Sequence, residues 1–301
     1  MRSTTRHHVV SPAELSALRD LELLTRATVE GLRQGLHRSP FHGFSAEFSQ
    51  YRHYRPGDDL KYVDWKAFGR TDRLYSRQFR ETTNLGALFV VDCSRSMAFP
   101  EDAPTKFDRA RAAAAVLAAL VIDQGDAAGL LALPGDESAR IEYLPARSGR
   151  HHLRLHLAAL ARLTSSGAAG VAAALRRAGG LLRRRGLIVV ISDFYEDEAA
   201  LVEIRRLARM GHDVVVIQIM ARQELTLPRG GAIEFVDLET GARLVTSPDG
   251  VAADYARNVE GFLRRVRQAV EGDGLDYLRL LADEPLEPAL RRFLIGRRGR
   301  A

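Results

Sequence analysis

Two aspartates and two serines supply the oxygen atoms of the strongest candidate site in the sequence. Asp92, Ser94 and Ser96 stand at alternate positions after the apolar run 87–91, and Asp193 ends a second apolar run. This spacing lets three oxygens face one point, and carboxylate and hydroxyl oxygens suit a hard divalent cation that keeps some water. The spacing alone leaves a second interpretation open, in which Ser94 and Ser96 only cap the adjoining turn or helix.

Apolar runs that alternate with helical segments predict the framework that brings these residues together. Strands are expected at 87–91, 127–133, 140–144, 186–193, 213–220 and 275–281, and helices at about 105–124, 151–163, 170–185, 198–210, 251–271 and 285–295. The alternation predicts an α/β fold with a doubly wound, mostly parallel sheet flanked by helices. Ligands of such sheets bind outside the carboxyl ends of the strands, near the switch in strand order. We therefore expect Asp92 and Asp193 to meet at one edge of the sheet.

The remaining segments predict an N-terminal extension and a hairpin. The capping-box pattern of residues 11–14 starts a helix that runs to about Gly35. Aromatic, basic and acidic residues alternate from 36 to 84, which favours short strands and tight turns. The expected domains are 1–83, an N-terminal helix with an aromatic-rich extension, and 84–301, the α/β domain. Period-two alternation at 232–245 predicts a hairpin within the second domain.

Composition limits the class of protein. The chain has 301 residues, of which 46% are hydrophobic and 27% are charged, so it can bury a full core. This excludes a disordered chain and a collagen-like repeat. One cysteine cannot form an internal disulfide, so we expect a reducing compartment, the cytoplasm. The longest apolar run, 112–122, falls short of the roughly 20 residues that span a bilayer, and no signal-peptide pattern follows Met1. We expect a soluble protein without a membrane partner.

The net charge of +6 comes from 44 lysines and arginines against 38 aspartates and glutamates. Nearly all the cations are arginines, and they lie in short clusters spread over several predicted helices. A single basic stripe would indicate nucleic-acid binding, whereas this dispersal favours solvated helix faces.

Asp92, Ser94, Ser96 and Asp193 together resemble the metal-ion-dependent adhesion site of von Willebrand factor A domains. That site has the pattern Asp-x-Ser-x-Ser, a distant threonine and a later strand-end aspartate. The resemblance implies the same fold and a magnesium or manganese ion, which the serines contact directly and the aspartates contact directly or through water. It also implies that a carboxylate of a protein partner completes the coordination, so that the site serves adhesion and assembly.

A longer resemblance covers nearly the whole chain and is carried by the segments 43–48, 51–59, 63–66, 239–241 and 290–294. Together they are similar to the family catalogued as domain of unknown function 58, in which such elements surround a von Willebrand-type domain. The resemblance implies a bacterial or archaeal origin. It also implies a partner ATPase of the MoxR-type AAA+ group, acting in chaperone-like or metal-insertion work.

One position departs from the adhesion-site pattern. Alignment of the helix that begins near Val171 places Ala169 where the threonine hydroxyl is expected. Thr164, Ser165 and Ser166 lie at least three residues upstream. Loss of one oxygen weakens a hard-cation site without removing it, because carboxylates dominate its electrostatics.

The turn that carries the family pattern has a structural interpretation of its own. Proline followed by glycine suits the centre of a type II turn, and the flanking carboxylates are placed to pair with arginine or to cap the next segment of chain. We interpret these residues as a structural latch in which the tryptophan pins the N-terminal segment to the α/β domain. A partner-binding or catalytic role is the alternative. The residues concerned are Arg52, Tyr54, Pro56, Gly57, Asp58, Asp64 and Trp65.

Other reactive residues give weaker signals. His152 and His156 have metal-compatible i, i+4 spacing, but no third ligand is evident and we expect them on a helix surface. Cys93 is expected to be a buried bystander. No phosphate-binding glycine loop and no Gly-x-Ser-x-Gly elbow occur in the sequence.

The sequence thus predicts a cytoplasmic, non-enzymatic module that binds a protein partner through a divalent cation held by Asp92, Ser94, Ser96 and Asp193. The family resemblance implies that this partner is an AAA+ ATPase. A metal-dependent phosphoesterase or nuclease built on Asp92 and Asp193 is the alternative from another class, and the basic surface favours it. We expect it less because no histidine or lysine base accompanies the aspartates. Sequence-independent nucleic-acid binding is a third interpretation, which a steep salt dependence would reveal.

Overall fold

A computed structural model describes most of the chain, which divides into two compact units. One unit comprises Met1–Pro40 and Gly86–Ala301, and the other comprises Phe41–Leu85. The residues described are 12–35, 47–54, 63–71, 73–80, 85–101, 104–134, 142–167, 170–182, 184–195, 198–228, 230–238 and 240–298.

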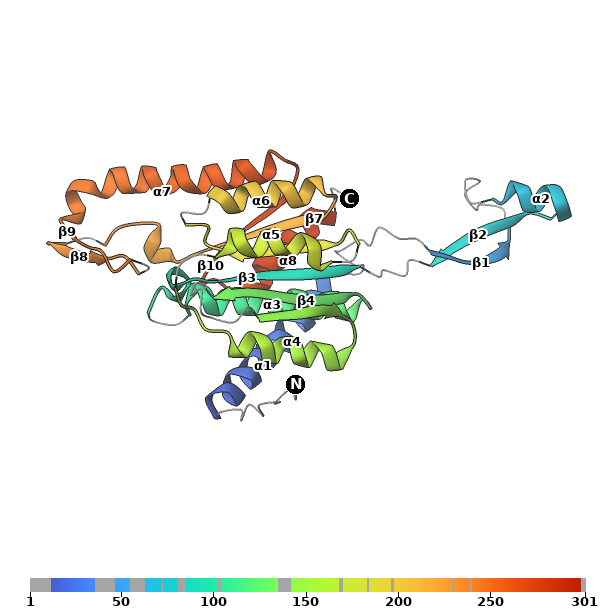
Figure 1. The fold of residues 1–301 in the computed structure, drawn as a ribbon, viewed down its shortest axis with the longest axis horizontal. Coiled ribbons are helices and arrows are strands. Elements are labelled where there is room, and N and C mark those ends of the chain that lie inside the picture. The colour runs from blue at the N-terminus through green and yellow to red at the C-terminus, as the bar shows by residue number, and fades with distance from the viewer. Residues whose placement is uncertain are drawn as a thin grey trace, which may run out of the picture. The chain divides into compact units, whose positions relative to one another are not determined.

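The larger unit is built on a six-stranded sheet in the order β10-β7-β6-β3-β4-β5 (Figure 1). Its strands are β3 (Gly86–Cys93), β4 (Ala127–Pro134), β5 (Glu142–Arg147), β6 (Leu187–Ser192), β7 (Asp213–Met220) and β10 (Asp276–Leu281). All neighbours are parallel except β4 and β5. Along the chain, β4 and then β5 are added on one side of β3, and β6 is then added on its other side. The doubly wound, mostly parallel sheet is therefore confirmed, and its switch point lies between β3 and β6.

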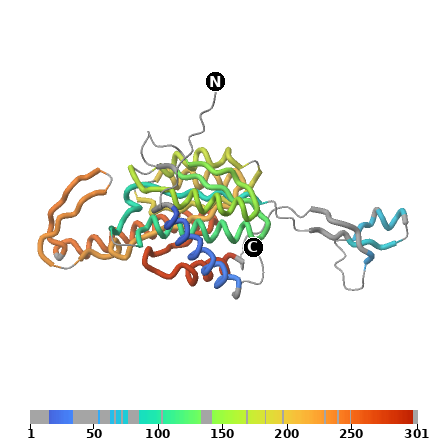
Figure 2. The backbone as a smooth tube through the Cα atoms, turned by 90° about the horizontal axis from the view of Figure 1, so that it is seen from below, coloured from blue at the N-terminus to red at the C-terminus, as the bar shows by residue number. Residues whose placement is uncertain are grey.

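Helices cover both faces of this sheet (Figure 1). One face carries α5 (Val171–Leu181), α6 (Glu198–Arg209) and α7 (Pro248–Glu271). The other carries α3 (Lys106–Asp123), α4 (Arg150–Arg162) and α8 (Leu286–Arg298). The N-terminal helix α1 (Pro12–Gly35) packs outside α3, α4 and α8, and Figure 2 shows it beside α8. It therefore belongs with the α/β unit, a different grouping from the one expected with a boundary at residue 83.

The core lies on both sides of the central strands. Every residue of β6 is buried, as is every residue of β3 after Gly86, which explains why both strands are uninterrupted apolar runs. The run 112–122 is a buried stretch of α3, where small alanine side chains let the helix lie between the sheet and α1. None of the helices in the described ranges combines the length and the hydropathy needed to span a membrane.

A hairpin, the start of α7 and two short 3₁₀ helices complete the larger unit. The strands β8 (Ile233–Val236) and β9 (Arg243–Thr246) form the predicted antiparallel hairpin. Helix α7 starts at Pro248, three residues before the expected start at 251, because proline suits the first turn of a helix. Two 3₁₀ helices, η2 (Arg95–Ala98) and η3 (Arg222–Glu224), follow β3 and β7.

The smaller unit contains β1 (Glu47–His53), α2 (Trp65–Thr71) and β2 (Tyr75–Arg80). The two strands pair antiparallel with an irregularity between Phe48 and Gln50. Buried Asp64 caps α2, because its Oδ1 accepts a hydrogen bond from the N–H of Ala67 (3.0 Å). This cap produces a short helix where the sequence indicated only strands and turns. The ring of Trp65 meets that of Phe68 edge-on, with 6.4 Å between centroids.

The latch stays a prediction. Arg52 and Tyr54 lie in and just after β1, and Asp64 and Trp65 lie at the start of α2. Pro56, Gly57 and Asp58 lie outside the described residues.

Candidate functional site at the switch point

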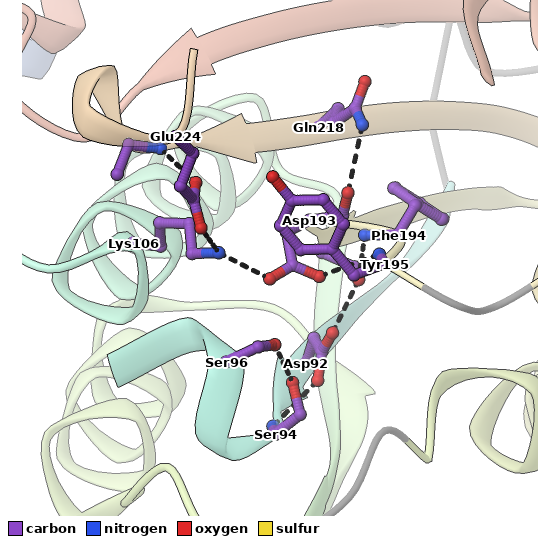
Figure 3. Close-up of polar contacts among 11 residues, drawn as sticks. Asp92, Ser94, Ser96, Lys106, Asp193, Phe194, Tyr195, Gln218 and Glu224 are labelled. Carbon is purple, nitrogen blue, oxygen red and sulfur yellow. Dashed lines mark hydrogen bonds and ion pairs between the residues drawn. The ribbon is translucent and has the colours of Figure 1, made fainter. Parts of the chain in front are cut away.

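The structure brings Asp92, Ser94, Ser96 and Asp193 together at the carboxyl edge of the sheet (Figure 3). Strands β3 and β6 are neighbours, and Val91 pairs with Ile191. Continuing this register places Asp92 beside Ser192, with Asp193 one residue further along. The two aspartates therefore flank the switch point, where doubly wound sheets bind their ligands.

Asp92 is held rigidly in this arrangement. Its Oδ1 accepts a hydrogen bond from the N–H of Ser94 (2.8 Å), and its Oδ2 accepts one from the hydroxyl of Ser192 (2.5 Å). The same hydroxyl accepts a bond from the N–H of Phe194 (2.9 Å). Burial, and after it the negative charge of Asp193, raise the pKa of Asp92 to about 6. A positive charge placed here would favour the ionised carboxylate.

The two serine hydroxyls face each other. Ser94 Oγ lies 3.0 Å from Ser96 Oγ. Ser94 occupies the N-cap position of η2, yet its side chain makes no capping hydrogen bond. The interpretation of Ser94 as a cap is therefore wrong, and its hydroxyl is turned toward the other oxygens of the site (Figure 3).

Asp193 forms an ion pair with a buried lysine. Its Oδ2 lies 2.7 Å from Nζ of Lys106, and its Oδ1 accepts a bond from the N–H of Tyr195 (3.1 Å). Nζ of Lys106 also donates to Oε1 of Glu224 at 2.5 Å. The side chain of Lys106 has no exposed surface, and the Tyr195 ring centroid lies 4.8 Å from Nζ. The sequence pattern gave no sign of this lysine beside the aspartates.

A capping box places Lys106 at the first position of α3. Thr105 and Asp108 exchange hydrogen bonds between side chain and backbone, which fixes the start of the helix beside the switch point. Burial alone would lower the pKa of Lys106, but the carboxylates of Asp193 and Glu224 outweigh it and raise the pKa above its ordinary value. The amine is therefore protonated at neutral pH and supplies no general base.

Two further polar side chains support the backbone of Asp193. Gln218 on β7 donates from Nε2 to the backbone carbonyl of Asp193 (3.0 Å), and the hydroxyl of Tyr277 donates to Oε1 of Gln218 (2.6 Å). Sequence reasoning missed Lys106, Ser192, Gln218 and Glu224. Lys106 carried one signal, since it is one of only three lysines in a chain rich in arginine.

The loop before α5 also reaches the site through its backbone. The N–H of Ser166 donates to the carbonyl of Cys93 (2.7 Å), and the N–H of Arg95 donates to the carbonyl of Gly167 (2.9 Å). Ser165 and Ser166 are half-buried, and Thr164 is exposed. Ala169, at the expected threonine position, lies outside the described residues.

A pocket of about 440 Å³ opens beside the site. Its lining includes Ser96, Tyr195, Glu224, Val236 and Tyr255, from η2, the turn after β6, η3, the hairpin and α7. A second pocket of about 680 Å³ shares Glu224, Val236 and Tyr255 with it, so the two form adjacent parts of one hollow. The hollow combines apolar and aromatic walls with a few polar groups, as binding pockets commonly do.

The oxygen atoms present fit a hard cation only in part. Asp92, Ser94 and Ser96 offer a carboxylate and two hydroxyls, which is suitable chemistry for magnesium or manganese. Asp193 is neutralised by the ammonium of Lys106. Within the described residues, no group of three or more His, Cys, Asp or Glu side chains is placed to hold a metal ion. Binding of a cation stays a prediction.

The two histidines are not on a helix surface as expected. His152 and His156 are both buried, because i, i+4 spacing places them on the face of α4 that turns toward the sheet. A ring nitrogen of His152 lies 2.7 Å from the carbonyl oxygen of Ala128. The ring of His156 packs edge-on against Phe89, with 5.7 Å between centroids. Cys93 is fully buried, as predicted.

Comparison with protein-family models assigns this chain to a family. The family model described as "Protein of unknown function DUF58" matches residues 50–261. Two mycobacterial relatives, uncharacterized protein Rv1480 of Mycobacterium tuberculosis and uncharacterized protein Mb1516 of Mycobacterium bovis, are each 32% identical over 300 residues. Each alignment covers 98% of this chain and 93% of the relative.

Solved structures that align with the chain include two of low sequence identity. The conserved hypothetical protein BatB from Bacteroides thetaiotaomicron is 17% identical, covers 71% of this chain and 99% of its own, and has a TM-score of 0.46. The SpRpn10 VWA domain is 17% identical, covers 72% of this chain and 95% of its own, and has a TM-score of 0.40.

Proposed function

This chain belongs to the DUF58 family, and from that premise we propose that its doubly wound α/β unit is a von Willebrand factor A-like, non-enzymatic protein-interaction module. The observation that carries the proposal is the pair of hydroxyls, Ser94 and Ser96, fixed beside Asp92 at the switch point and next to an open pocket. These groups present oxygen atoms to an incoming partner at the edge where such sheets bind ligands.

The chemistry of the site favours binding over turnover. Hydrolysis at a metal centre uses an activated water and a group that accepts its proton. Asp92 is committed to Ser94 and Ser192, and Lys106 is protonated, buried and paired. His152 and His156 lie between α4 and the sheet rather than among the site oxygens. The groups described at the site therefore mainly orient one another, which favours binding.

The partner in this proposal is an AAA+ ATPase of the MoxR-type group, the class that the family resemblance implies. The module would present a client or an assembly to the ATPase in chaperone-like maturation. The hollow beside Ser96 accommodates a side chain of the partner, because its walls include Tyr195, Tyr255 and Val236 and because it is continuous with the site.

A divalent cation, magnesium or manganese, is the finer part of the proposal. Asp92, Ser94 and Ser96 would hold it, and the cation would supply a positive charge that attracts a partner carboxylate. Calorimetry with MnCl₂ tests this part, with heat expected for the wild-type chain and none for Asp92→Ala. Absence of heat in the wild type would limit the site to direct protein contacts.

Binding to a purified MoxR-type ATPase from the same genome tests the module itself. We expect Ser96→Ala and Asp92→Asn to weaken binding at least tenfold in biolayer interferometry. Ser148→Ala is the matched control, because Ser148 follows Arg147, which pairs with Ala128 at the opposite edge of the sheet. Unchanged binding in both site variants would overturn the proposal, as would phosphodiester hydrolysis by the wild type that Asp92→Asn abolishes.

A further inference from the structure

Lys106 places a permanent positive charge inside the candidate site. Its Nζ lies 2.7 Å from Oδ2 of Asp193 and 2.5 Å from Oε1 of Glu224, and its side chain is fully buried. The Tyr195 ring covers the ammonium from a third side. A divalent cation held by Asp92, Ser94 and Ser96 would therefore lie near a second positive charge, the ammonium that is paired with the neighbouring carboxylate of Asp193 (Figure 3).

Glu224 gives this ammonium a second anchor away from Asp92. Its Oε2 accepts a bond from the N–H of Ala221 (2.7 Å), and its backbone carbonyl accepts one from the hydroxyl of Tyr255 (2.8 Å). These contacts fix Glu224 on η3, independently of β3 and β6. Lys106 thus lies between two carboxylates that belong to different elements, and only one of them belongs to the switch-point pair.

The choice of lysine is informative in this chain. Its basic residues are almost all arginines, and Lys61, Lys66 and Lys106 are its only lysines. An arginine fork would bind both carboxylates in one fixed geometry, whereas an ammonium on a flexible four-carbon stem can keep one partner and release the other. Such a side chain suits an exchangeable contact.

We propose that Lys106 is an internal competitor for the divalent cation of this site. Its ammonium holds Asp193 in the cation-free chain, and it retreats to Glu224 alone when a cation held by Asp92, Ser94 and Ser96 recruits Asp193 as a further ligand. Lys106 and Glu224 therefore set the affinity of the site for a divalent cation. The inference rests on the cation-binding part of the proposed function and names the residues that regulate it.

Calorimetric titration of the full chain with MnCl₂ at low ionic strength tests the competition. We expect Lys106→Met to bind Mn²⁺ at least tenfold more tightly than the wild type, because the competing charge is gone. Glu224→Gln should bind more weakly than the wild type, because the ammonium then depends more strongly on Asp193. Lys66→Met, on α2 of the smaller unit, is the control that removes one lysine charge elsewhere and should match the wild type.

A second variant keeps the test decisive if Lys106→Met fails to fold. The double variant Lys106→Met with Glu224→Gln preserves the net charge of the buried cluster, and it should also bind Mn²⁺ at least tenfold more tightly than the wild type. Equal Mn²⁺ affinity in the wild type and in these Lys106 variants would overturn the inference, and so would absence of Mn²⁺ binding in all of them. Loss of ATPase binding in Ser96→Ala does not depend on this result. The proposed binding of the ATPase can therefore be correct even if Lys106 does not compete with the cation.

Discussion

The ammonium of Lys106 and the carboxylate of Asp193 form a buried ion pair that links the start of α3 to the end of β6. Their charged atoms lie 2.7 Å apart, and the two side chains are 0% and 2% exposed. Burying two charges costs solvation energy that only good geometry and further hydrogen bonds offset. Here Glu224 and the N–H of Tyr195 supply those bonds. The pair therefore secures the switch-point edge while both partners remain.

Lys106→Met is expected to lower the free energy of unfolding by about 3–5 kcal/mol, because it leaves buried carboxylates without their cation. Urea denaturation measures the loss. Adding Asp193→Asn should recover part of it, since the second substitution removes one of the uncompensated charges.

An exposed ion pair provides the control. Arg33 and Asp123 also join two elements, at 2.9 Å, but their side chains are 57% and 35% exposed. Arg33→Met should cost less than about 1 kcal/mol, because solvent screens the pair. Equal losses in the two variants would show that burial of the Lys106 pair has no energetic consequence.

Gly186→Ala should disrupt the contact between β3 and β6 that aligns Asp92 with Asp193. An added Cβ at Gly186 would lie 2.2 Å from the backbone oxygen of Gly86, and backbone cannot move aside as a side chain does. We expect a loss of about 3 kcal/mol in the free energy of unfolding. Thermal or urea unfolding measures it.

Gly180→Ala is the matched control for that substitution. Gly180 lies in α5 with nothing within 4 Å of an added Cβ. Alanine there should stabilise the protein by about 0.5–1 kcal/mol, because glycine is a poor helix former. If Gly186→Ala were equally stabilising, the close approach of β3 and β6 would be wrong.

The sequence was sufficient to predict the sheet and the meeting of its two aspartates. Apolar runs of the right length mark buried parallel strands, and the carboxyl ends of such strands share one edge. This rule alone is enough to predict that Asp92 and Asp193 lie close together. Helix α2 was missed because its seven residues are too few to show a helical period, and its Asp64 cap is a local contact in an alternating segment.

The environment of Asp193 was not predictable in the same way. Lys106 lies 87 residues from Asp193 and 118 residues from Glu224 along the chain. Lys106 and Glu224 do not belong to a periodic apolar pattern. Each is buried because its charge is paired with that of a partner, and not because its side chain is apolar. His152 and His156 were misplaced for a related reason, since a polar residue type on an amphipathic helix was assigned to the outer face.

Acid should destabilise the protein through His156. Burial, and after it the nearby charge of His152, lower the pKa of His156 from 6.5 to about 3. Between these values the unfolded chain binds a proton that the native state does not, so stability falls as the pH falls from 6.5 toward 3. Below pH 6 this contribution approaches about 1.4 kcal/mol per pH unit.

His156→Leu should remove that slope from the pH dependence of the unfolding free energy. At pH 7 the variant should be at least as stable as the wild type, because neither ring nitrogen of His156 has a hydrogen-bond partner in the described structure. His151→Leu, at an exposed position of the same helix, should keep the slope of the wild type. Parallel pH profiles for wild type and His156→Leu would contradict the burial of this ring.

Cys93 should be inert in the native protein and should report opening of the switch-point edge. The thiol is fully buried, and burial, with the charge of Asp92 as a second cause, raises its pKa to about 12. A thiol reagent such as Ellman's reagent at pH 8 therefore finds neither a thiolate nor access, and labelling should proceed only through opening. Because this is the only cysteine, each labelled molecule reports one position. Gly186→Ala should accelerate labelling while Gly180→Ala should slow it or leave it unchanged, since only the former separates β3 from β6. Labelling of the native wild type at the rate of a free thiol would mean that the end of β3, and with it Asp92, is open to solvent.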